Sequence, residues 1–371
     1  MRDGIRIRMR VDGLLHPVAN LDKDKYRIFM GELSSRANVS TASNKPQSGH
    51  MQKEIHRDGA THLFNIRVET IPTMYGQDAV LRLFNFDESL LNLDLLGLSK
   101  EERAEINDVI SHPRGLVLMV GPTGSGKSTT LYSMLNALNT TDKKIITLED
   151  PIEYGITGIS QIPINTNAGG SFAEGLRSVL RLDPDVVMVG KIRDADTAKT
   201  AIQASITGHL VLSSFHANTT SAAFSRMIDL IGVNPIFASS IRLIVAQRLV
   251  RKLSNTKKAR PATEAERDYI RDVMKGVKAD ILSDFDMENI VLYDPVATEE
   301  EPFGYNGRTV IMEQLVVGDD IQAFIRGDIA DINTKAIEET ARKNGMLTLE
   351  QKGVLAVLRG ETTLEEVSRV I

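Results

Sequence analysis

Residues 121–129 carry the clearest chemical signal in the sequence, because they combine three glycines with a lysine and several hydroxyl side chains. Residues 121–128 match the pattern G-x-x-x-x-G-K-[ST] directly after an apolar run and directly before a helical pattern. In such a loop the backbone N–H groups point at phosphate oxygens, and the following helix adds the positive end of its dipole. The alternative is a glycine-rich turn that only joins a strand to a helix, and the complete match in this context favours the phosphate site.

The residue types of this loop predict nucleotide chemistry. Lys127 is expected to reach the β- and γ-phosphates of ATP, and the Ser128 hydroxyl to ligate Mg²⁺. We predict Ser128 and Asp150 as the metal ligands, with ATP and Mg²⁺ as cofactors. The predicted nucleotide-binding residues are Gly121, Pro122, Thr123, Gly124, Ser125, Gly126, Lys127, Ser128 and Thr129.

An acidic segment, residues 147–154, offers the first candidates for handling water or metal. Glu149 and Asp150 close an apolar run typical of a strand, so they are expected to face Mg²⁺ or the attacking water. Glu153 is expected to share part of that role. A solvated acidic turn is the usual interpretation of an isolated Glu-Asp-Pro sequence, and it stays open here.

Two further segments place polar residues after apolar runs. Residues 183–194 hold the second run, which ends in Lys191 and Arg193 at the Walker B position. In residues 207–218, His209 and His216 flank the third run, and His216 is placed to donate a hydrogen bond to a γ-phosphate. A lone histidine is more often structural, so the residues leave both interpretations of His216 open.

The elements that must position these residues alternate between strand and helix patterns. Strands are predicted over 116–120, 145–148, 186–189 and 210–214, with helices between them, one of which covers 128–138. This order predicts an α/β fold with a mostly parallel, doubly wound sheet and a ligand crevice at the carboxyl ends of the strands. Residues 254–301 are charged and weakly patterned and are predicted to be a peripheral insertion. From Thr309 onward the chain is expected to be helical, with amphipathic segments over 347–358 and 364–370.

The first 85 residues have a different pattern, typical of a smaller α+β domain. Alternating residues predict strands over 5–11, 64–68 and 79–84 and a helix near 23–34, whereas the polar stretch 37–52 is predicted to be a mobile loop. Residues 86–100 are predicted to be a linker, and Ser99 with Glu102 forms a capping-box pattern that opens a helix. The domain prediction is therefore 1–85, the linker, and an ATPase domain over 101–371. Because the chain opens within a strand pattern, we expect the full domain to begin upstream.

Composition excludes several classes of protein. The chain has 371 residues, of which 42% are hydrophobic and 25% charged, the balance of a globular protein. It has no cysteine, so disulfides and thiolate zinc sites are impossible and a cytosolic setting is favoured. No run of apolar residues is long enough for a membrane span, and the start has no secretory signal pattern. The net charge of −5 disfavours a protein that coats nucleic acid, although residues 1–60 carry a local excess of basic residues.

Four motifs together carry a resemblance to a known family. GPTGSGKSTT, TLEDPIEY, LRLDPDVVMVG with the following IRD, and TGHLVLSSFHAN resemble the Walker A, Asp-box, Walker B and His-box segments of the secretion ATPases of type II secretion and type IV pilus assembly. Residues 5–18, Arg67–Pro72, Gly76, Arg82 and the C-terminal segments from Gly304 and Gly345 resemble the assembly-type members. The resemblance spans nearly the whole chain.

This resemblance implies a PAS-like N-terminal domain followed by a RecA-like P-loop ATPase domain. It also implies a homo-oligomer, a hexameric ring, at the cytoplasmic face of the inner membrane, where it drives an inner-membrane platform protein; no nucleic acid partner is expected. Nucleotide is expected between the two domains, with Arg67, Arg82 and Arg193 neutralising charge on the γ-phosphoryl group. A polar strand face is the alternative for Arg67 and Arg82.

The sequence departs from the family at two places. Many relatives have a four-cysteine zinc site where this chain has Ser254 and no cysteine, so we predict no zinc and an insertion that is held without metal or is floppy. The Walker B segment usually reads Gly-Glu-Ile-Arg-Asp, and here Lys191 replaces the glutamate. A cation therefore stands where a carboxylate near Mg²⁺ or water is expected, which puts hydrolysis in doubt.

Three functions are compatible with these residues. The first is an ATP-hydrolysing motor for pilus assembly or protein secretion. The second is a nucleotide-binding ring subunit with impaired hydrolysis, which Lys191 keeps open. The third is a nucleic-acid translocase, for which an aromatic content of 5% and the absence of tryptophan offer little base stacking.

Overall fold

The computed structural model describes residues 5–40, 42–57, 60–84 and 91–371. The chain divides into two compact units, Met1–Glu88 and Ser89–Ile371. Among the described residues no helix is both long enough and apolar enough to cross a bilayer.

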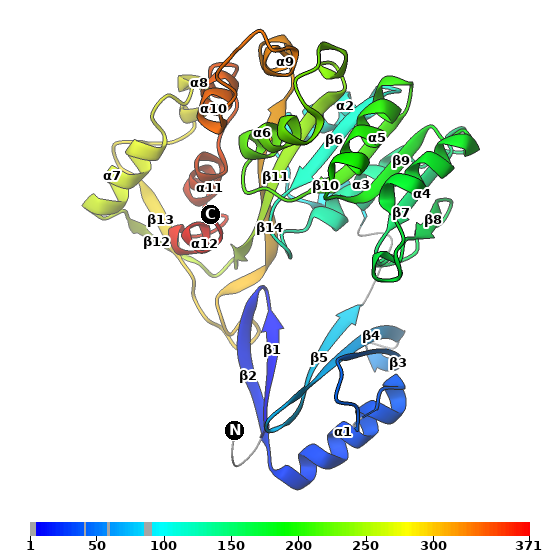
Figure 1. Ribbon diagram of the computed structural model, residues 1–371. Coiled ribbons are helices and arrows are strands. Elements are labelled where there is room, and N and C mark those ends of the chain that lie inside the picture. The colour runs from blue at the N-terminus through cyan, green and yellow to red at the C-terminus, as the bar shows by residue number, and fades with distance from the viewer. Residues whose placement is uncertain (1–4, 41, 58–59, 85–90) are drawn as a thin grey trace. The chain divides into compact units, whose positions relative to one another are not determined.

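The first unit combines a hairpin, one helix and a three-stranded antiparallel sheet (Figure 1). Met30, Leu33 and Ala37 on the helix pack against Ile66 and Val68 on the central strand to form a small core. The elements are β1 (Ile5–Val11), β2 (Leu14–Leu21), α1 (Lys23–Ala37), β3 (Gln47–Arg57), β4 (Ala60–Thr73) and β5 (Gly76–Phe84).

The stretch 37–52, predicted to be a loop, instead contains the start of β3. Its polar residues do not prevent strand formation, because the backbone from Gln47 onward pairs in antiparallel register with β4. Gly49 is required for this path, since a Cβ there would lie 2.0 Å from the Ala37 carbonyl oxygen at the end of α1. The prediction failed because it followed side-chain polarity, whereas backbone pairing with β4, the next strand along the chain, decides the conformation.

The second unit is built on a seven-stranded sheet in the order β14-β11-β6-β10-β9-β7-β8. All neighbours are parallel except β14, which runs antiparallel to β11 at one edge. The strands are β6 (Gly115–Val120), β7 (Ile145–Glu149), β8 (Ser160–Pro163), β9 (Val186–Ile192), β10 (Leu210–Phe215), β11 (Ile241–Leu253) and β14 (Tyr305–Val316). The strands predicted over 116–120, 145–148, 186–189 and 210–214 are confirmed, and their continuous burial is typical of strands covered on both faces.

Helices cover both faces of this sheet. The chain leaves β6 toward β7 through α3 and returns through α4, α5 and α6, so right-handed crossovers place α3 on one face and the other three on the opposite face (Figure 1). The capping box at the start of α2 is confirmed, because Ser99 and Glu102 each accept the other's backbone N–H. The helices are α2 (Lys100–Ser111), α3 (Lys127–Leu138), α4 (Phe172–Val179), α5 (Ala195–Ile206) and α6 (Thr220–Ile231).

The predicted helical region from Thr309 begins with a strand instead. Residues 309–316 belong to β14, whose pairing with β11 buries Ile311, Met312 and Leu315. An antiparallel edge strand on a parallel sheet has its partner far away in sequence, so its local pattern alone did not identify it. Helices follow as predicted: α9 (Asp319–Arg326), α10 (Thr334–Lys343), α11 (Leu349–Leu358) and α12 (Leu364–Val370).

The insertion over 254–301 has its own secondary structure. It contains β12 (Lys258–Pro261), α7 (Glu264–Val273), α8 (Ala279–Leu282) and β13 (Val291–Asp294), with β12 and β13 paired antiparallel. Ile270, Ile290 and Leu292 are buried in the same apolar cluster as the main sheet. Its path outside the sheet is seen beside α11 and α12 in Figure 1.

Candidate nucleotide-binding site

The predicted phosphate loop joins the buried strand β6 to α3. Gly126 is the N-cap of α3, and it provides no side-chain hydrogen bond to the first turn, which also lacks an acidic residue. Other helices of this unit, including α5 and α6, have side-chain caps from Asp194 and Thr219. The first N–H groups of α3 therefore lack a side-chain acceptor and are suited to an anion.

Lys127 occupies the first position of this helix, and no carboxylate of the described residues forms an ion pair with it. Its ammonium group donates to the carbonyl oxygens of Gly121 at 2.8 Å and Pro122 at 2.7 Å. Burial, with the charges of Arg248 and Lys191 nearby, lowers the pKa of Lys127 to about 8. A phosphate would relieve this repulsion, because it adds negative charge where the protein gathers positive charge.

The loop fits a phosphate chain by two further observations. Gly121 and Gly126 have positive φ, and a Cβ on either would come within 2.7 Å of a Gln247 atom, so both must be glycine. The Ser125 hydroxyl is buried inside the loop without a hydrogen-bond partner. Such an orphaned group is unusual in a protein interior and is available to a ligand. Pro122, Thr123, Gly124, Ser128 and Thr129 are exposed around it.

Gln247 and Arg248 on β11 were not predicted as site residues, yet they hold the loop. The Gln247 amide donates to the Ser125 carbonyl at 2.8 Å, and its oxygen accepts from the Thr130 hydroxyl at 2.8 Å. Arg248 donates to three carbonyl oxygens, those of Gln247, Asn218 and Val370. The signal was a Gln-Arg pair inside an apolar strand, since buried polar groups in a sheet need specific partners.

The acidic segment lies at the carboxyl end of β7, where its residues differ in surroundings. Glu149 is 4% exposed and accepts hydrogen bonds from Tyr132, Thr147 and Gln161. Burial raises the pKa of Tyr132, and the hydrogen bond to Glu149 raises it further. Asp150 is half-buried and accepts from the Thr166 hydroxyl, while Glu153 is exposed. Glu149 therefore belongs to an internal hydrogen-bond network. To orient a water molecule, its carboxylate would have to give up one of these three hydrogen bonds.

The structure brings the start of α3 toward this segment. Ser128 lies one helical turn before Tyr132, whose hydroxyl donates to Glu149, so the exposed Ser128 hydroxyl and the end of β7 face the same side of α3. Ser128 and the Asp150 oxygen not used by Thr166 are oxygen donors of the kind that Mg²⁺ prefers. The described residues contain no cluster of three or more such side chains, so a metal would depend on ligands from the nucleotide.

Lys191, Arg193 and His216 lie at the carboxyl ends of the neighbouring strands β9 and β10. His216 is exposed directly after β10, and its carbonyl oxygen accepts from Arg226 at 3.0 Å. Burial lowers the pKa of His216, and the charges of Lys127, Arg193, Lys191 and Arg226 lower it further. The sheet thus places two cations at the carboxyl end of β9 and an imidazole after β10 on the side of the phosphate loop, as parallel strand ends predict.

His209 and Arg67 have partners of their own. His209 Nδ1 lies 3.1 Å from the Ala204 carbonyl oxygen at the other end of β10. Arg67 on β4 is paired in register with Arg82 on β5, and it donates to Glu69 at 2.7 Å, whereas Arg82 is exposed. Both arginines belong to the first unit, and their role toward nucleotide stays a prediction.

Comparison with known proteins places these features in a family. The model of the type II/IV secretion system protein family matches residues 2–369. The chain belongs to this family. The family resemblance of the motifs is thereby confirmed.

Individual relatives of this family member include both branches suggested by the motifs. Type II secretion system protein E of Xanthomonas campestris pv. campestris is 38% identical over 367 residues, which cover 99% of this chain and 62% of that protein. Type IV pilus assembly ATPase PilB of Pseudomonas aeruginosa is 37% identical over 371 residues, covering 98% and 62%. The chain thus spans less than two thirds of the length of these two relatives.

Solved structures of similar fold cover the whole chain. The ATPase DotB of Yersinia pseudotuberculosis superposes with a TM-score of 0.69 at 20% identity, covering 100% of this chain and 88% of DotB. The pilus retraction motor PilT, solved with bound ADP, gives a TM-score of 0.60 at 22% identity, covering 100% and 93%. The predicted α/β fold class with a RecA-like P-loop domain is confirmed.

Proposed function

We propose that this protein is an ATP-hydrolysing motor that powers type II protein secretion or type IV pilus assembly. The observation that carries the proposal is the phosphate loop, where an uncapped helix start and Lys127 meet further cations from β9 and β11. An ordinary connecting turn gains nothing from such repulsion, whereas a triphosphate offsets it. The relatives are a type II secretion protein and a type IV pilus assembly ATPase, which supports the process that the motor would serve.

Each site residue has a task in this proposal. Lys127 and the N–H groups at the start of α3 bind the phosphates, and Ser128 and Asp150 would hold Mg²⁺, which supplies charge neutralisation when bound. Glu149 and Glu153 are proposed to orient water, and His216 to donate to the γ-phosphate. Charge on the phosphoryl group is proposed to be neutralised by Arg193 and by two arginines of the first unit, Arg67 and Arg82.

The assembly is proposed to be a hexameric ring on the cytoplasmic face of the inner membrane, in contact with a platform protein. The names of the relatives and the family match support this proposal. Light scattering with and without ATP and Mg²⁺ tests the ring. Only monomer at high protein concentration in both conditions would count against it.

The deciding experiment is an ATPase assay on the purified chain with and without DNA. We expect phosphate release that depends on Lys127 and is not stimulated by DNA. Turnover unchanged in Lys127→Ala would reject the site, and strong stimulation by DNA would favour a nucleic-acid translocase instead.

A second candidate, a nucleotide-binding subunit with impaired hydrolysis, is favoured by Lys191. Within the described residues Lys191 has no ion pair with a carboxylate, so its charge remains close to the phosphate loop. We expect Lys191→Glu to raise turnover at least about tenfold in saturating Mg²⁺, the lower range for a positioned base. Fast turnover in the wild type that Lys191→Glu leaves unchanged would exclude impairment.

A further inference from the structure

Lys191 is a half-buried cation that the fold leaves without a partner. Across residues 5–40, 42–57, 60–84 and 91–371 its side chain makes no hydrogen bond and no ion pair. Lys352, a comparably buried lysine elsewhere in the unit, is instead paired with Glu102 at 2.8 Å. An unpaired cation that lies beside other cations is favoured by an anion that binds among them, so the position points to an anionic ligand.

The backbone around Lys191 fixes where this cation lies. Val189 pairs with Ser213 and Ile192 with Phe215, so Gly190 and Lys191 of β9 together stand opposite Ser214 of β10. This two-against-one arrangement is a β-bulge, a feature that redirects side chains and occurs next to active sites. The Ser214 hydroxyl donates to the Gly190 carbonyl and so attaches the bulge to β10.

On the side of the bulge that faces β7, close packing requires the glycine at position 190. A Cβ at Gly190 would lie 3.0 Å from the Leu148 carbonyl oxygen and 3.4 Å from the Glu149 Cα. The bulge is therefore packed between the ends of β7 and β10. This packing fixes the backbone of Lys191 at the edge of the sheet that carries the phosphate loop.

The charge of Lys191 acts on the nucleotide site. It contributes, after burial and Arg248, to the lowered pKa of Lys127, and it also contributes to the lowered pKa of His216. Many P-loop proteins bring the second positive charge as a divalent metal that a carboxylate near this position helps to hold. Here a fixed ammonium group stands near that position, and Glu149 is committed to three donors.

We propose that Lys191 supplies to the bound phosphates the positive charge that a divalent metal brings elsewhere, so that this site binds ATP or ADP without a divalent metal. The inference rests on the proposed nucleotide function and concerns binding, not hydrolysis. An ammonium group makes charge-assisted hydrogen bonds to phosphate oxygens, so it can replace the metal in neutralising them, although not in orienting water.

The test is equilibrium binding of ATP to the full chain by titration calorimetry, once in Mg²⁺ and once in EDTA. We expect the wild-type Kd to change by less than about fivefold between the two conditions. Lys191→Gln and Lys191→Glu are expected to bind at least about tenfold more weakly in EDTA than in Mg²⁺, the size of one lost charge-assisted contact. Lys191→Arg should retain binding in EDTA.

Controls separate the possible failures. Lys275→Gln removes the same charge from the insertion, where Lys275 is paired with Asp272, and should behave as the wild type. Wild-type binding that weakens about fivefold or more in EDTA would overturn the inference while leaving the nucleotide function intact. Absence of ATP binding in both conditions, with a folded protein by circular dichroism, would overturn the nucleotide function and this inference with it.

Discussion

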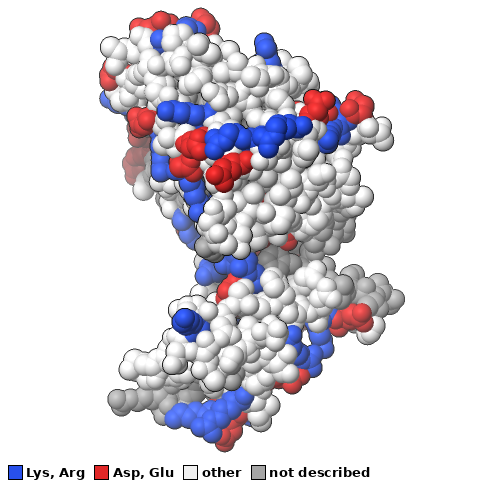
Figure 2. Space-filling view, turned by 45° about the vertical axis from the view of Figure 1, so that its right-hand side comes forward, with Lys and Arg blue, Asp and Glu red and all other residues white. Residues whose placement is uncertain are grey.

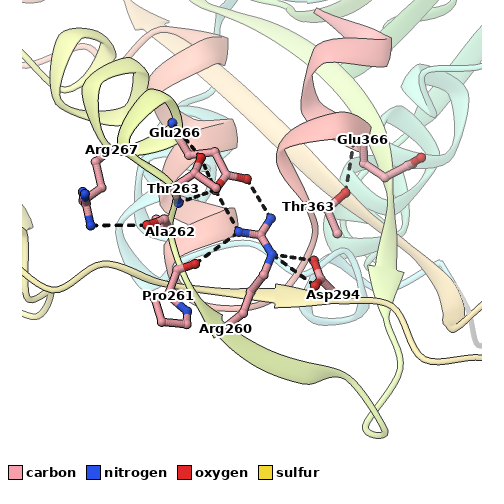
Figure 3. Close-up of polar contacts among 9 residues, drawn as sticks. All are labelled: Arg260, Pro261, Ala262, Thr263, Glu266, Arg267, Asp294, Thr363 and Glu366. Carbon is pink, nitrogen blue, oxygen red and sulfur yellow. Dashed lines mark hydrogen bonds and ion pairs between the residues drawn. The ribbon is translucent and has the colours of Figure 1, made fainter.

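Charged side chains are arranged in opposite ways at the phosphate loop and at two arginine clusters in the C-terminal half. In the first cluster Arg260 binds Glu266 through two nitrogens and also Asp294, so β12, α7 and β13 are joined (Figure 3). In the second, Arg251 and Arg369 both pair with Glu366, which is 2% exposed. Around the phosphate loop, by contrast, Lys127 and Arg248 have only carbonyl acceptors.

The difference separates charges that hold the fold from charges that await a ligand. On one face of the second unit, Figure 2 shows Lys and Arg side chains interspersed with Asp and Glu. Neighbouring cations that form no ion pair with a carboxylate repel one another, which destabilises the folded protein. The presence of unpaired cations at the carboxyl ends of the sheet strands therefore indicates a function. The clusters of Arg251 and Arg260, by contrast, are explained by their role in holding the fold.

The largest expected effect is on ATP binding at the phosphate loop, where the cations are unpaired. Lys127→Ala should weaken ATP binding at least about 100-fold, because it removes charge-assisted contacts to two phosphates. Titration calorimetry measures the loss. Lys275→Ala, which removes a paired lysine of the insertion, is the matched control and should leave the Kd unchanged. Equal effects of the two variants would erase the distinction between the regions.

On the paired side, Glu366→Ala should lower the free energy of unfolding by about 3–5 kcal/mol, because Arg251 and Arg369 lose a buried partner. Burial by itself raises the pKa of Glu366, but hydrogen bonds from Arg369 and Arg251 outweigh it and lower the pKa to about 2. The stabilisation is thus present above the ordinary value of 4.5 and is lost as the pH falls toward 2. Urea denaturation measures both effects. Glu365→Ala, an exposed neighbour on α12, is the control, and a similar loss there would contradict the argument.

The pH dependence of ATP affinity tests the unpaired charge of Lys127 at the phosphate loop. The pKa of Lys127 is lowered to about 8 in the free protein, and a bound anion favours its charged form. Affinity should therefore fall as the pH rises through 8, by about tenfold between pH 7 and pH 9. Lys127→Arg stays protonated over this range and should give a flatter profile. If the ATP affinity of the wild type does not change over the same pH range, Lys127 is not the titrating group.

A smaller effect is expected in the insertion. Arg260→Ala should lower the free energy of unfolding by about 1 kcal/mol, since its pairs with Glu266 and Asp294 are partly exposed to solvent. Its hydrogen bonds lower the pKa of Glu266 to about 2. Thermal denaturation measures the change. Arg267→Ala, which loses a single contact to the Ala262 carbonyl, should cost less, and ATP affinity should be unaffected by either variant.

The smallest expected effect is that of metal removal on stability. The insertion has apolar packing through Ile270 and Leu292 and the Arg260 cluster, so chelation with EDTA should leave the melting temperature unchanged. Elemental analysis is the companion measurement. Stoichiometric zinc, lost together with stability on chelation, would contradict the prediction that no zinc is bound.

The sequence by itself determined the local structure of the phosphate loop. Residues 121–128 are contiguous, and the positive φ of its glycines and the helix that starts at Lys127 are local properties that a short stretch can specify. The predicted strands 116–120 and 210–214 are likewise confirmed, because a continuous apolar run is recognisable without its neighbours.

Only the tertiary structure decided what surrounds that loop. Gln247 contacts Ser125 across 122 residues of sequence, and Arg248 contacts Val370 across another 122. The strands β3 and β14 were missed because each is defined by pairing with another strand, β4 for β3 and β11 for β14, and not by an apolar pattern of its own. Lys191 illustrates both contributions. The sequence marked the residue as unusual, but only the structure shows that it lies unpaired at a bulge between β7 and β10. Such contacts depend on sheet order and register, which the global packing of the chain selects.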